Sequence, residues 1–337
     1  MTQAKWLLVG GETLAGKEIR DMVEERKLPI ELALASAETS ERILSKEEDE
    51  LSVIAPLDAD AVEDAAVILL AGAPATHRLA RDMVLASKAN VRPALVDVTG
   101  ALQDLPEARL CAPVLEHMPE RGENFVYVPA HPVAVALARL LKALKAAPPV
   151  EVVATVFEPA SERDKAGIDE LHRQVISLFN FKTLPKEVFD AQTAFNLLPR
   201  YGEDAPVSLG SVQSRIEDEL ATLAGALGLT PPNIKLVHAP VFHSYTMNVW
   251  LRFETGSADA KAVSAALEAA GFEVRGDDVE PGSNAGVANQ SGITISDVAV
   301  DRTNAKACWL WAAFDNLRAR ADNALLTAAL LSQGANK

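Results

Sequence analysis

The sequence predicts an α/β protein of two domains: a doubly wound parallel sheet and a second α+β domain with a largely antiparallel mixed sheet. Short, fully apolar runs predict the first sheet, because parallel strands are buried on both faces. Helical segments alternate with these runs, which is typical of right-handed crossovers. After the break at Ala146-Ala147-Pro148-Pro149 the pattern changes to longer strands with alternating apolar residues. The 337 residues are enough for two domains.

The first domain is expected to hold residues 1–130 and the final helix, 317–337. Its strands are predicted at Lys5–Gly11, Ile30–Ser36, Ala66–Gly72, Arg92–Val98 and Phe125–Val128. A helix with Ile19, Met22 and Val23 on one face follows the first strand, and Ala75–Lys88 is a crossover helix. The charge-rich segment Glu38–Glu50 is expected to be a solvated loop or an exposed helix.

The second domain is expected to span residues 131–316. A helix begins at Pro132, because proline suits the first helical position, and a strand follows at Val150–Phe157. The helix Glu162–Asn180 has a predicted apolar face of Ile168, Leu171, Val175, Leu178 and Phe179. Another helical stripe consists of Val212, Ile216, Leu220, Leu223 and Leu227. The segment Val237–Phe253 reads as one long strand with apolar residues at odd positions and polar residues, including His238, at even positions.

Composition excludes several classes of function. The net charge of −15 argues against binding to nucleic acid or to an anionic membrane surface. No apolar run approaches the ~20 residues of a membrane span, and no signal-peptide pattern is present, so a cytoplasmic location is expected. Cys111 and Cys308 lie in apolar, strand-like contexts and are predicted to be buried thiols without a disulfide.

His131 lies where a predicted strand meets the start of a helix. The first N–H groups of a helix have no partner within the helix, and its dipole stabilises an anion there. Enzymes often place a nucleophile at such a junction. Here the residue is a histidine, for which the positive helix end favours the neutral ring.

Segments along the whole chain resemble the aspartate-β-semialdehyde dehydrogenase family. In family order they are VGGETLAGKEIRDMVEERKLP (Val9–Pro29), DVTGAL (Asp97–Leu102), AFNLLP (Ala194–Pro199), HAPVFHSYT (His238–Thr246) and DNLR (Asp315–Arg318). The segment around His131 resembles the family's N-P-N-C-S/T, whose cysteine attacks the aldehyde before hydride passes to nicotinamide and phosphate captures the thioester. The resemblance is closest to the family's Usg-like paralogues, which keep the fold and alter the nucleophile.

The resemblance implies that the catalytic positions are vestigial. His131 replaces the cysteine, and Glu158 replaces the glutamine that orients the acyl intermediate. Tyr245 replaces the general-base histidine, although a phenol with a pKa of ~10 is a poor base near neutrality. His238 replaces the arginine that grips the substrate carboxylate, and it lacks the planar fork for bidentate contacts.

Two further positions bear on substrate and phosphate. Gln103 replaces a phosphate-binding arginine, whereas Arg215 keeps a positive charge where the family has lysine. Catalytic groups act as a unit, so their joint loss predicts a homologue without dehydrogenase chemistry, with ligand or nucleotide binding left open. The alternative is an NAD(P)-dependent oxidoreductase that acts on a different substrate and uses His131 or Tyr245 as acid/base.

The first strand runs into a glycine-containing turn and a helix, which is the context of a Rossmann-type nucleotide site. Gly10 and Gly16 fit this pattern, but Thr13 stands where the family has glycine. Glu38 would repel the 2′-phosphate of NADP and could accept from the ribose of NAD. Asn316, in DNLR, is a further candidate contact. Either the turn is kept for packing without a cofactor, or it binds NAD, with NADP the least favoured.

Two expectations concern metals and assembly. His131, His238 and His243 could gather by resemblance near one cleft, but a regular strand would send the last two to opposite faces, so no metal site is predicted. Family members pair through the sheets of their second domains. The strand ACWLWAAF, Ala307–Phe314, is apolar on both faces, so a sheet with helices on one side would leave an apolar face open. A homodimer is therefore predicted; in the alternative, helices of the same chain cover both faces.

Overall fold

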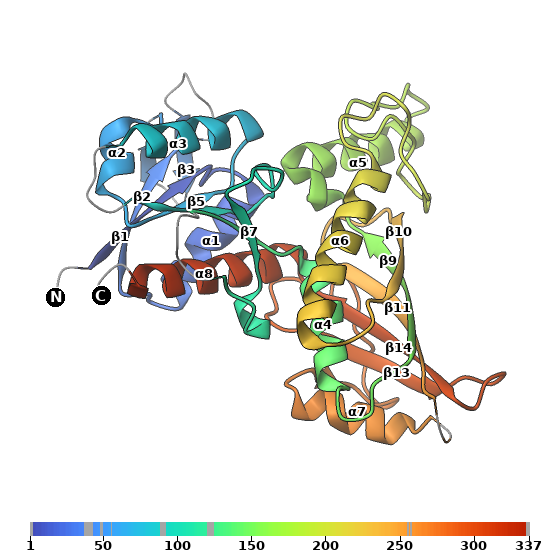
Figure 1. Ribbon diagram of the computed structural model, residues 1–337. Coiled ribbons are helices and arrows are strands. Elements are labelled where there is room, and N and C mark those ends of the chain that lie inside the picture. Colours follow the sequence, from blue (N-terminus) through green and yellow to red (C-terminus); the bar gives the residue numbers. More distant parts are fainter. Residues whose placement is uncertain are drawn as a thin grey trace. The chain divides into compact units, whose positions relative to one another are not determined.

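The computed structural model describes residues 3–36, 43–47, 50–54, 56–87, 92–119, 125–254, 256 and 258–334. The chain forms two compact units, residues 1–130 with 320–337, and residues 131–319. The last helix, α8 (Asn316–Gly334), therefore returns most of its length to the first unit (Figure 1).

The first unit is built on a six-stranded parallel sheet with the strand order β2-β1-β5-β6-β8-β7. Its strands are β1 (Ala4–Val9), β2 (Ile30–Ala35), β5 (Val67–Leu70), β6 (Ala94–Asp97), β7 (Ala108–Cys111) and β8 (Val126–Pro129). All residues of β5, β6 and β8 are buried, as expected for strands with helices on both faces. The predicted doubly wound parallel sheet is confirmed.

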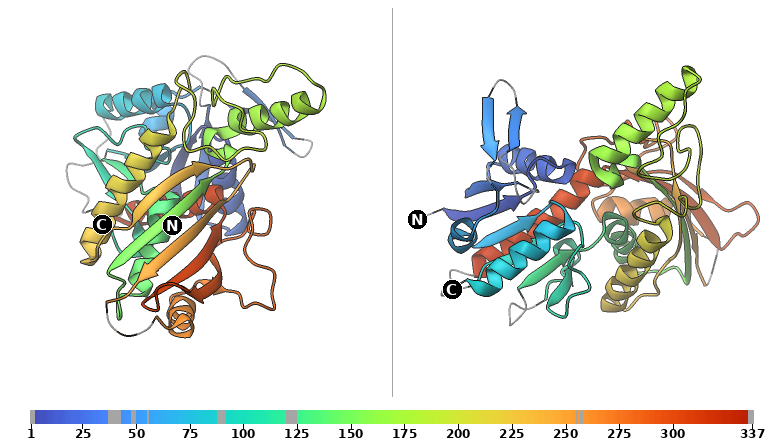
Figure 2. Two further views of the ribbon diagram at one scale, coloured as in Figure 1. Left: turned by 90° about the vertical axis from the view of Figure 1, so that its right-hand side faces the viewer. Right: turned by 90° about the horizontal axis from the view of Figure 1, so that it is seen from above.

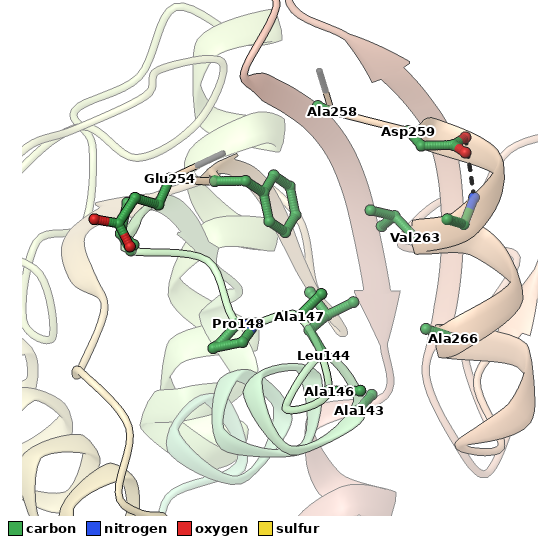
Figure 3. Close-up of a pocket in the computed structure, with 13 residues that line it drawn as sticks. Ala143, Leu144, Ala146, Ala147, Pro148, Glu254, Ala258, Asp259, Val263 and Ala266 are labelled. Carbon is green, nitrogen blue, oxygen red and sulfur yellow. Dashed lines mark hydrogen bonds between the residues drawn. The ribbon is translucent and has the colours of Figure 1, made fainter. Parts of the chain in front are cut away.

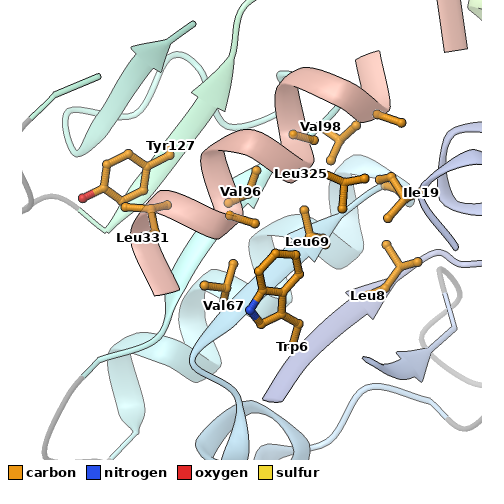
Figure 4. Close-up of a cluster of buried hydrophobic side chains, with 14 of the residues drawn as sticks. Trp6, Leu8, Ile19, Val67, Leu69, Val96, Val98, Tyr127, Leu325 and Leu331 are labelled. Carbon is orange, nitrogen blue, oxygen red and sulfur yellow. The ribbon is translucent and has the colours of Figure 1, made fainter. Parts of the chain in front are cut away.

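Two apolar cores lie on opposite faces of this sheet. Alternate residues of β1 point to opposite sides, so Trp6 and Leu8 pack with α1 (Leu14–Glu25) and α8, as Figure 4 shows. Leu7 packs with α2 (Ala59–Asp64) and α3 (Pro74–Ala86) on the other side. Burial of one such side chain contributes about 1.5–3 kcal/mol. A short 3-10 helix, η1 (Pro113–Leu115), follows β7.

The charge-rich segment after β2 differs from the prediction. Within the described residues it forms β3 (Ile43–Glu47) and β4 (Glu50–Ile54), which pair antiparallel in a separate two-stranded sheet. A loop or helix was expected there because polar residues are weak strand formers. Pairing of the two strands satisfies the backbone groups regardless of that preference.

The second unit contains a mixed six-stranded sheet with the order β10-β9-β11-β14-β13-β12. Its strands are β9 (Glu151–Glu158), β10 (Asn233–His238), β11 (Tyr245–Arg252), β12 (Glu273–Val274), β13 (Thr294–Val300) and β14 (Ala307–Phe314). Only the β9–β10 and β12–β13 pairs are parallel; the other pairs are antiparallel, so the predicted mixed sheet is confirmed.

Three helices, α4 (Pro132–Ala143), α6 (Leu209–Leu227) and α7 (Ala260–Ala269), lie on one face of this sheet (Figure 1). In β11 the odd residues Met247, Val249 and Leu251 are buried beneath them. The even residues from Asn248 to Arg252 point to the other face and are only partly buried. The left view of Figure 2 looks onto this face, where the strands lie in front of the helices. We call it the open sheet face.

The segment predicted as one long strand is two strands. β10 ends at His238 and β11 begins at Tyr245, and Ser244 between them has a left-handed backbone with a φ of 72°. The break changes the phase: in β10 the even residues are buried, and in β11 the odd ones are. His238 therefore faces the covered side rather than the polar side, because a slip of one residue exchanges the two faces of a strand.

The apolar stripe predicted for α5 (Asp164–Phe179) is mostly not buried. Of its five residues only Leu171 is buried, and Phe179 is 72% exposed. The helix instead buries Glu170, which accepts from the N–H groups of residues 188 and 189, and Gln174, which bonds residues 193 and 194. Hydrogen bonds to the following loop, rather than the apolar stripe, decide which face of the helix is covered.

Cys111 and Cys308 are both buried thiols, as predicted. Burial raises the pKa of Cys308 to about 11, so its thiolate is disfavoured. No helix in the described part of the chain combines the length and apolar character that a membrane span needs.

Candidate functional site

His131 caps the helix that it precedes. β8 ends at Pro129, α4 begins at Pro132, and the Nδ1 atom of His131 accepts a hydrogen bond from the N–H of Val133 at 3.2 Å. The backbone N–H of His131 donates to the carboxylate of Glu219 on α6. The side chain is only 4% exposed. One ring nitrogen thus satisfies a helix N–H that would otherwise have no partner in the helix.

The other side of the His131 ring faces Glu162 and Tyr245. Its Nε2 atom lies 3.6 Å from Oε2 of Glu162, and the ring meets that of Tyr245 edge-on with centroids 5.8 Å apart. Glu162 belongs to the 3-10 helix η2 (Ala160–Arg163), directly after β9. The N–H of Val133, the carboxylate of Glu162 and the ring of Tyr245 thus orient the His131 ring from three sides.

Glu158, the last residue of β9, is the centre of a buried network. Its Oε1 accepts from the Tyr201 hydroxyl at 2.8 Å and from Nη2 of Arg163 at 2.9 Å. The Tyr245 hydroxyl lies 3.4 Å from Oε2. Because Glu158 has no exposed surface, these donors replace the water that a carboxylate needs.

The network continues from Tyr201 to His238. The Tyr201 oxygen and Nδ1 of His238 are 3.1 Å apart. Since the hydroxyl donates its proton to Glu158, Nδ1–H of His238 donates to the hydroxyl oxygen, which leaves Nε2 unprotonated in a neutral ring. Within the described chain this Nε2 atom is buried without a hydrogen-bond partner.

The charges in this network follow from burial and neighbours. Burial, and secondarily the positive charge of Arg163, lowers the pKa of His238 from 6.5 to about 3. Burial raises the pKa of Glu158, although Arg163 opposes that shift. Burial and the Glu158 carboxylate also raise the pKa of Tyr201. At neutral pH the imidazole of His238 and the phenol of Tyr201 are therefore both uncharged, and the neutral phenol of Tyr201 is a poor base.

The structure brings together all four catalytic-like positions named from the sequence: His131 touches Tyr245, which reaches Glu158, and Tyr201 joins that carboxylate to His238. Arg163 and Tyr201 were not predicted. Arg163 was expected inside a helix but lies in the turn before it, and Tyr201 comes from an irregular loop. Periodicity gives no signal for either, because Arg163 reaches Glu158 across a chain turn and Tyr201 reaches Glu158 and His238 from far along the sequence.

Arg215 and Asn316 have structural partners in the second unit. Nε of Arg215 lies 2.7 Å from Oε1 of Glu219, one turn further along α6. Asn316 is fully buried; its Oδ1 accepts from the N–H of Ser244 and its Nδ2 donates to Oε1 of Glu162 at 2.8 Å. The amide predicted to contact a cofactor thus joins the start of α8 to η2 and to the turn before β11.

The nucleotide-type turn belongs to the first unit. Gly10 has a φ of 86°, and a Cβ on Gly16 would stand 2.0 Å from the Gly10 oxygen, so both positions need glycine for the tight turn. Thr13 has a φ of −72° and is unstrained. Its Oγ1 caps α1 by accepting from the Gly16 N–H at 3.0 Å. That N–H is one that a pyrophosphate at a helix start would use.

Two other predicted positions give little further information. Gln103 is exposed in the turn after β6, which is held by Asp97. Asp97 is buried and lies 3.1 Å from Nδ1 of His77. Glu38 lies outside the described residues.

Two cavities in the second unit involve none of these positions. One of about 420 Å³ lies between the end of α4, the end of β11 and α7; Figure 3 shows its small apolar lining, with Glu254 and Asp259 at the rim. The other, of about 560 Å³, adjoins Trp311. In the described residues no group of three histidine, cysteine or carboxylate side chains is arranged to hold a metal ion.

The family model, the similar sequences and the similar solved structures all point to one protein family. The family model described as semialdehyde dehydrogenase, dimerisation domain, matches residues 137–319. A USG-1 protein homologue of Azotobacter vinelandii is 30% identical over 337 residues, which is 96% of each chain. One of Pseudomonas aeruginosa is 27% identical over 335 residues, 97% of this chain and 96% of the relative. The fold resembles that of aspartate semialdehyde dehydrogenase II from Vibrio cholerae, with a TM-score of 0.83, 20% identity and coverage of 98% and 99% of the two chains.

Proposed function

We propose a function for this chain, which belongs to the aspartate-semialdehyde dehydrogenase family and has USG-1 homologues among its relatives. It is a homodimeric member of the family that has lost the dehydrogenase reaction. That reaction needs a thiolate nucleophile, a general base and two anion clamps. The proposed function is a non-catalytic one, in which the former catalytic positions stabilise the second unit.

The state of His131 is the single observation that carries this proposal. The residue at the nucleophile position uses Nδ1 to cap its own helix and is oriented by Glu162 and Tyr245. An imidazole so placed cannot form the thioester that phosphate captures in the family reaction. The neighbouring Glu158 is likewise occupied by Arg163 and two tyrosines, so the donors around this carboxylate come from the protein itself.

The rival function, an oxidoreductase with His131 or Tyr245 as acid/base, gains less support. Tyr245 is fully buried, and its hydroxyl points to Glu158. A residue that exchanges protons with a substrate must reach it directly or through one water.

An activity assay tests the proposal. Purified protein is expected to show no phosphate-dependent oxidation of aspartate semialdehyde above background with either nicotinamide cofactor. His131→Cys alone should not restore turnover, because base and clamps remain absent. His131→Ala is the control: turnover that survives in it comes from a contaminating enzyme, whereas turnover that it abolishes contradicts the proposal.

For the cofactor we propose that the Gly10–Gly16 turn is kept for packing. A solved homologue from Candida albicans, 13% identical with a TM-score of 0.69, contains NADP. Here Gly10 and Gly16 keep the family's glycines, but Thr13 departs from the pattern and bonds the N–H of Gly16 with its own hydroxyl. If a dinucleotide binds, NAD is expected to bind more tightly than NADP. Calorimetry with NAD and NADP measures the two affinities, and tighter binding of NADP would contradict the expected preference for NAD.

The homodimer is proposed through the open sheet face. Val153, Trp250 and Trp309 lie in one row across β9, β11 and β14. Both indole N–H groups donate to Asp301, at 2.9 and 3.0 Å, and Trp309 is 39% exposed. Two indole rings held in this way beside an exposed valine suit an interface.

Light scattering tests this assembly. A mass near one chain, 35.9 kDa, at micromolar concentration would contradict it. Val153→Glu is expected to dissociate the dimer by placing a charge beside Trp250 in this row. Val153→Thr keeps the shape of the side chain and should leave the mass unchanged.

A further inference from the structure

A second apolar surface lies at the end of α5 and in the loop that follows it. We call it the arm patch, and its members are 46%, 72%, 98%, 63% and 60% exposed, in the order Ile176, Phe179, Phe181, Phe195 and Leu197. The rings of Phe179 and Phe195 meet edge-on with centroids 6.1 Å apart. Single exposed apolar residues are normal on a protein surface, but a cluster of three phenylalanines is not.

Two of these phenylalanines are held in an unfavourable backbone conformation. Phe181 has a φ of 54° and Phe195 a φ of 64°, in the left-handed region that is costly for bulky residues. Phe181 directly follows the C-cap of α5, a position that helices usually give to glycine. The same chain ends α6 with Gly228, at a φ of 70°. A phenylalanine that is strained and almost fully exposed contributes little to its own fold.

The arm patch is continuous with the open sheet face. Leu198 pairs with His238 at the edge of β10 through two backbone hydrogen bonds of 2.9 and 3.0 Å. Paired residues share a face, so Leu198 points to the covered side with His238, and Leu197 points to the opposite side. That side carries Phe157, whose ring lies 6.0 Å from that of Trp311.

We propose that the arm patch packs against a second copy of this chain and extends the interface formed by the open sheet face; this inference rests on the homodimer proposed above. A twofold dimer brings the same surface of each copy into one interface, so a patch that continues the sheet face is placed to join it. A phenylalanine presents on the order of 200 Å², so the three exposed rings supply roughly 450 Å². A standard interface buries about 800 Å² per partner, and the sheet face supplies the remainder.

The test exploits the backbone strain. Phe181→Gly removes the ring and relieves the left-handed residue, so it should weaken the dimer without weakening the fold. We expect the dimer dissociation constant, measured by sedimentation over a dilution series, to rise about tenfold or more. Phe195→Gly should act in the same way. In the dissociated Val153→Glu background, Phe181→Gly should raise the melting temperature.

Lys27 is a matched control. It follows the C-cap of α1, is exposed, and has a φ of 50°. Lys27→Gly should raise the melting temperature and leave the dissociation constant unchanged, because no apolar surface is lost.

The outcomes separate this inference from the proposal on which it rests. A wild-type monomer at micromolar concentration overturns both. A wild-type dimer that Val153→Glu dissociates, while Phe181→Gly and Phe195→Gly leave its dissociation constant unchanged, overturns the arm patch alone. A lower melting temperature for Phe181→Gly in the monomeric background also overturns it, because the ring then packs within its own chain.

Discussion

The buried imidazole of His238 should make the second unit sensitive to mild acid. The side chain has no exposed surface, and burial followed by the charge of Arg163 lowers its pKa from 6.5 to about 3. In the unfolded chain the ring takes up a proton below about pH 6.5, whereas in the fold it stays neutral. The unfolded state then binds more protons, so stability falls as the pH drops from 6.5 towards 3.

The magnitude follows from these two pKa values. Between about pH 7 and about pH 5 the linkage relation gives a loss of about 2 kcal/mol from this group alone. The His238→Asn variant keeps a hydrogen-bonding group near the position of Nδ1, opposite Tyr201, but does not titrate. It is expected to be less stable than wild type at pH 7, and to lose about 2 kcal/mol less on acidification.

Urea unfolding at the two pH values measures this difference. Three of the four tryptophans, at positions 250, 309 and 311, lie in the second unit, so tryptophan fluorescence follows mainly that unit. Protein concentration must be equal in all samples, because the proposed dimerisation would shift the apparent stability. His172→Asn, at an exposed position of α5, controls for the loss of a histidine. If wild type and His238→Asn lose equal stability on acidification, the burial argument is wrong.

Three other buried groups give further tests. Asp97→Asn should cost about 1–3 kcal/mol, because the carboxylate accepts several backbone N–H groups of the following turn, and an unchanged thermal melt would contradict this. Gly16→Ala should destabilise the first unit by about 1–3 kcal/mol or prevent its folding, since the new methyl group meets the Gly10 oxygen; circular dichroism of a normally folded variant would refute the clash. Arg163→Met should cost about 3–5 kcal/mol in urea unfolding by leaving Glu158 buried without its cation, and adding Glu158→Gln should recover part of the loss.

Much of the fold was predictable because its signals are local. β1, β5, β6 and β8 are short apolar runs, and α1 and α3 between them were predicted, so alternation indicated the doubly wound sheet. The start of α4 was also predictable, since Pro132 suits only the first turn. The errors occurred where hydrogen-bonded pairing outweighs the sequence pattern. In β3 and β4 the two strands satisfy each other's backbone groups, and in α5 the hydrogen bonds to the following loop bury Glu170 and Gln174.

The candidate site was predictable in part. Resemblance named His131, Glu158, His238 and Tyr245, and the structure places them in one connected cluster. It could not name Tyr201, which bridges two of them from an irregular loop. A residue of that kind has no periodic or motif signal in a single sequence.

The sequence by itself determined that a histidine, which cannot form a thiolate, stands in the segment that resembles the family's nucleophile segment. Only the tertiary structure decided what the remaining groups do. The phase change between β10 and β11 turns His238 inward, and the rings of Phe189 and Tyr201, from the segment between α5 and α6, pack against its imidazole. Burial of a side chain and its neighbouring charges and hydrogen-bond partners arise only from tertiary packing. They determine whether a titratable residue such as His238 is charged or neutral.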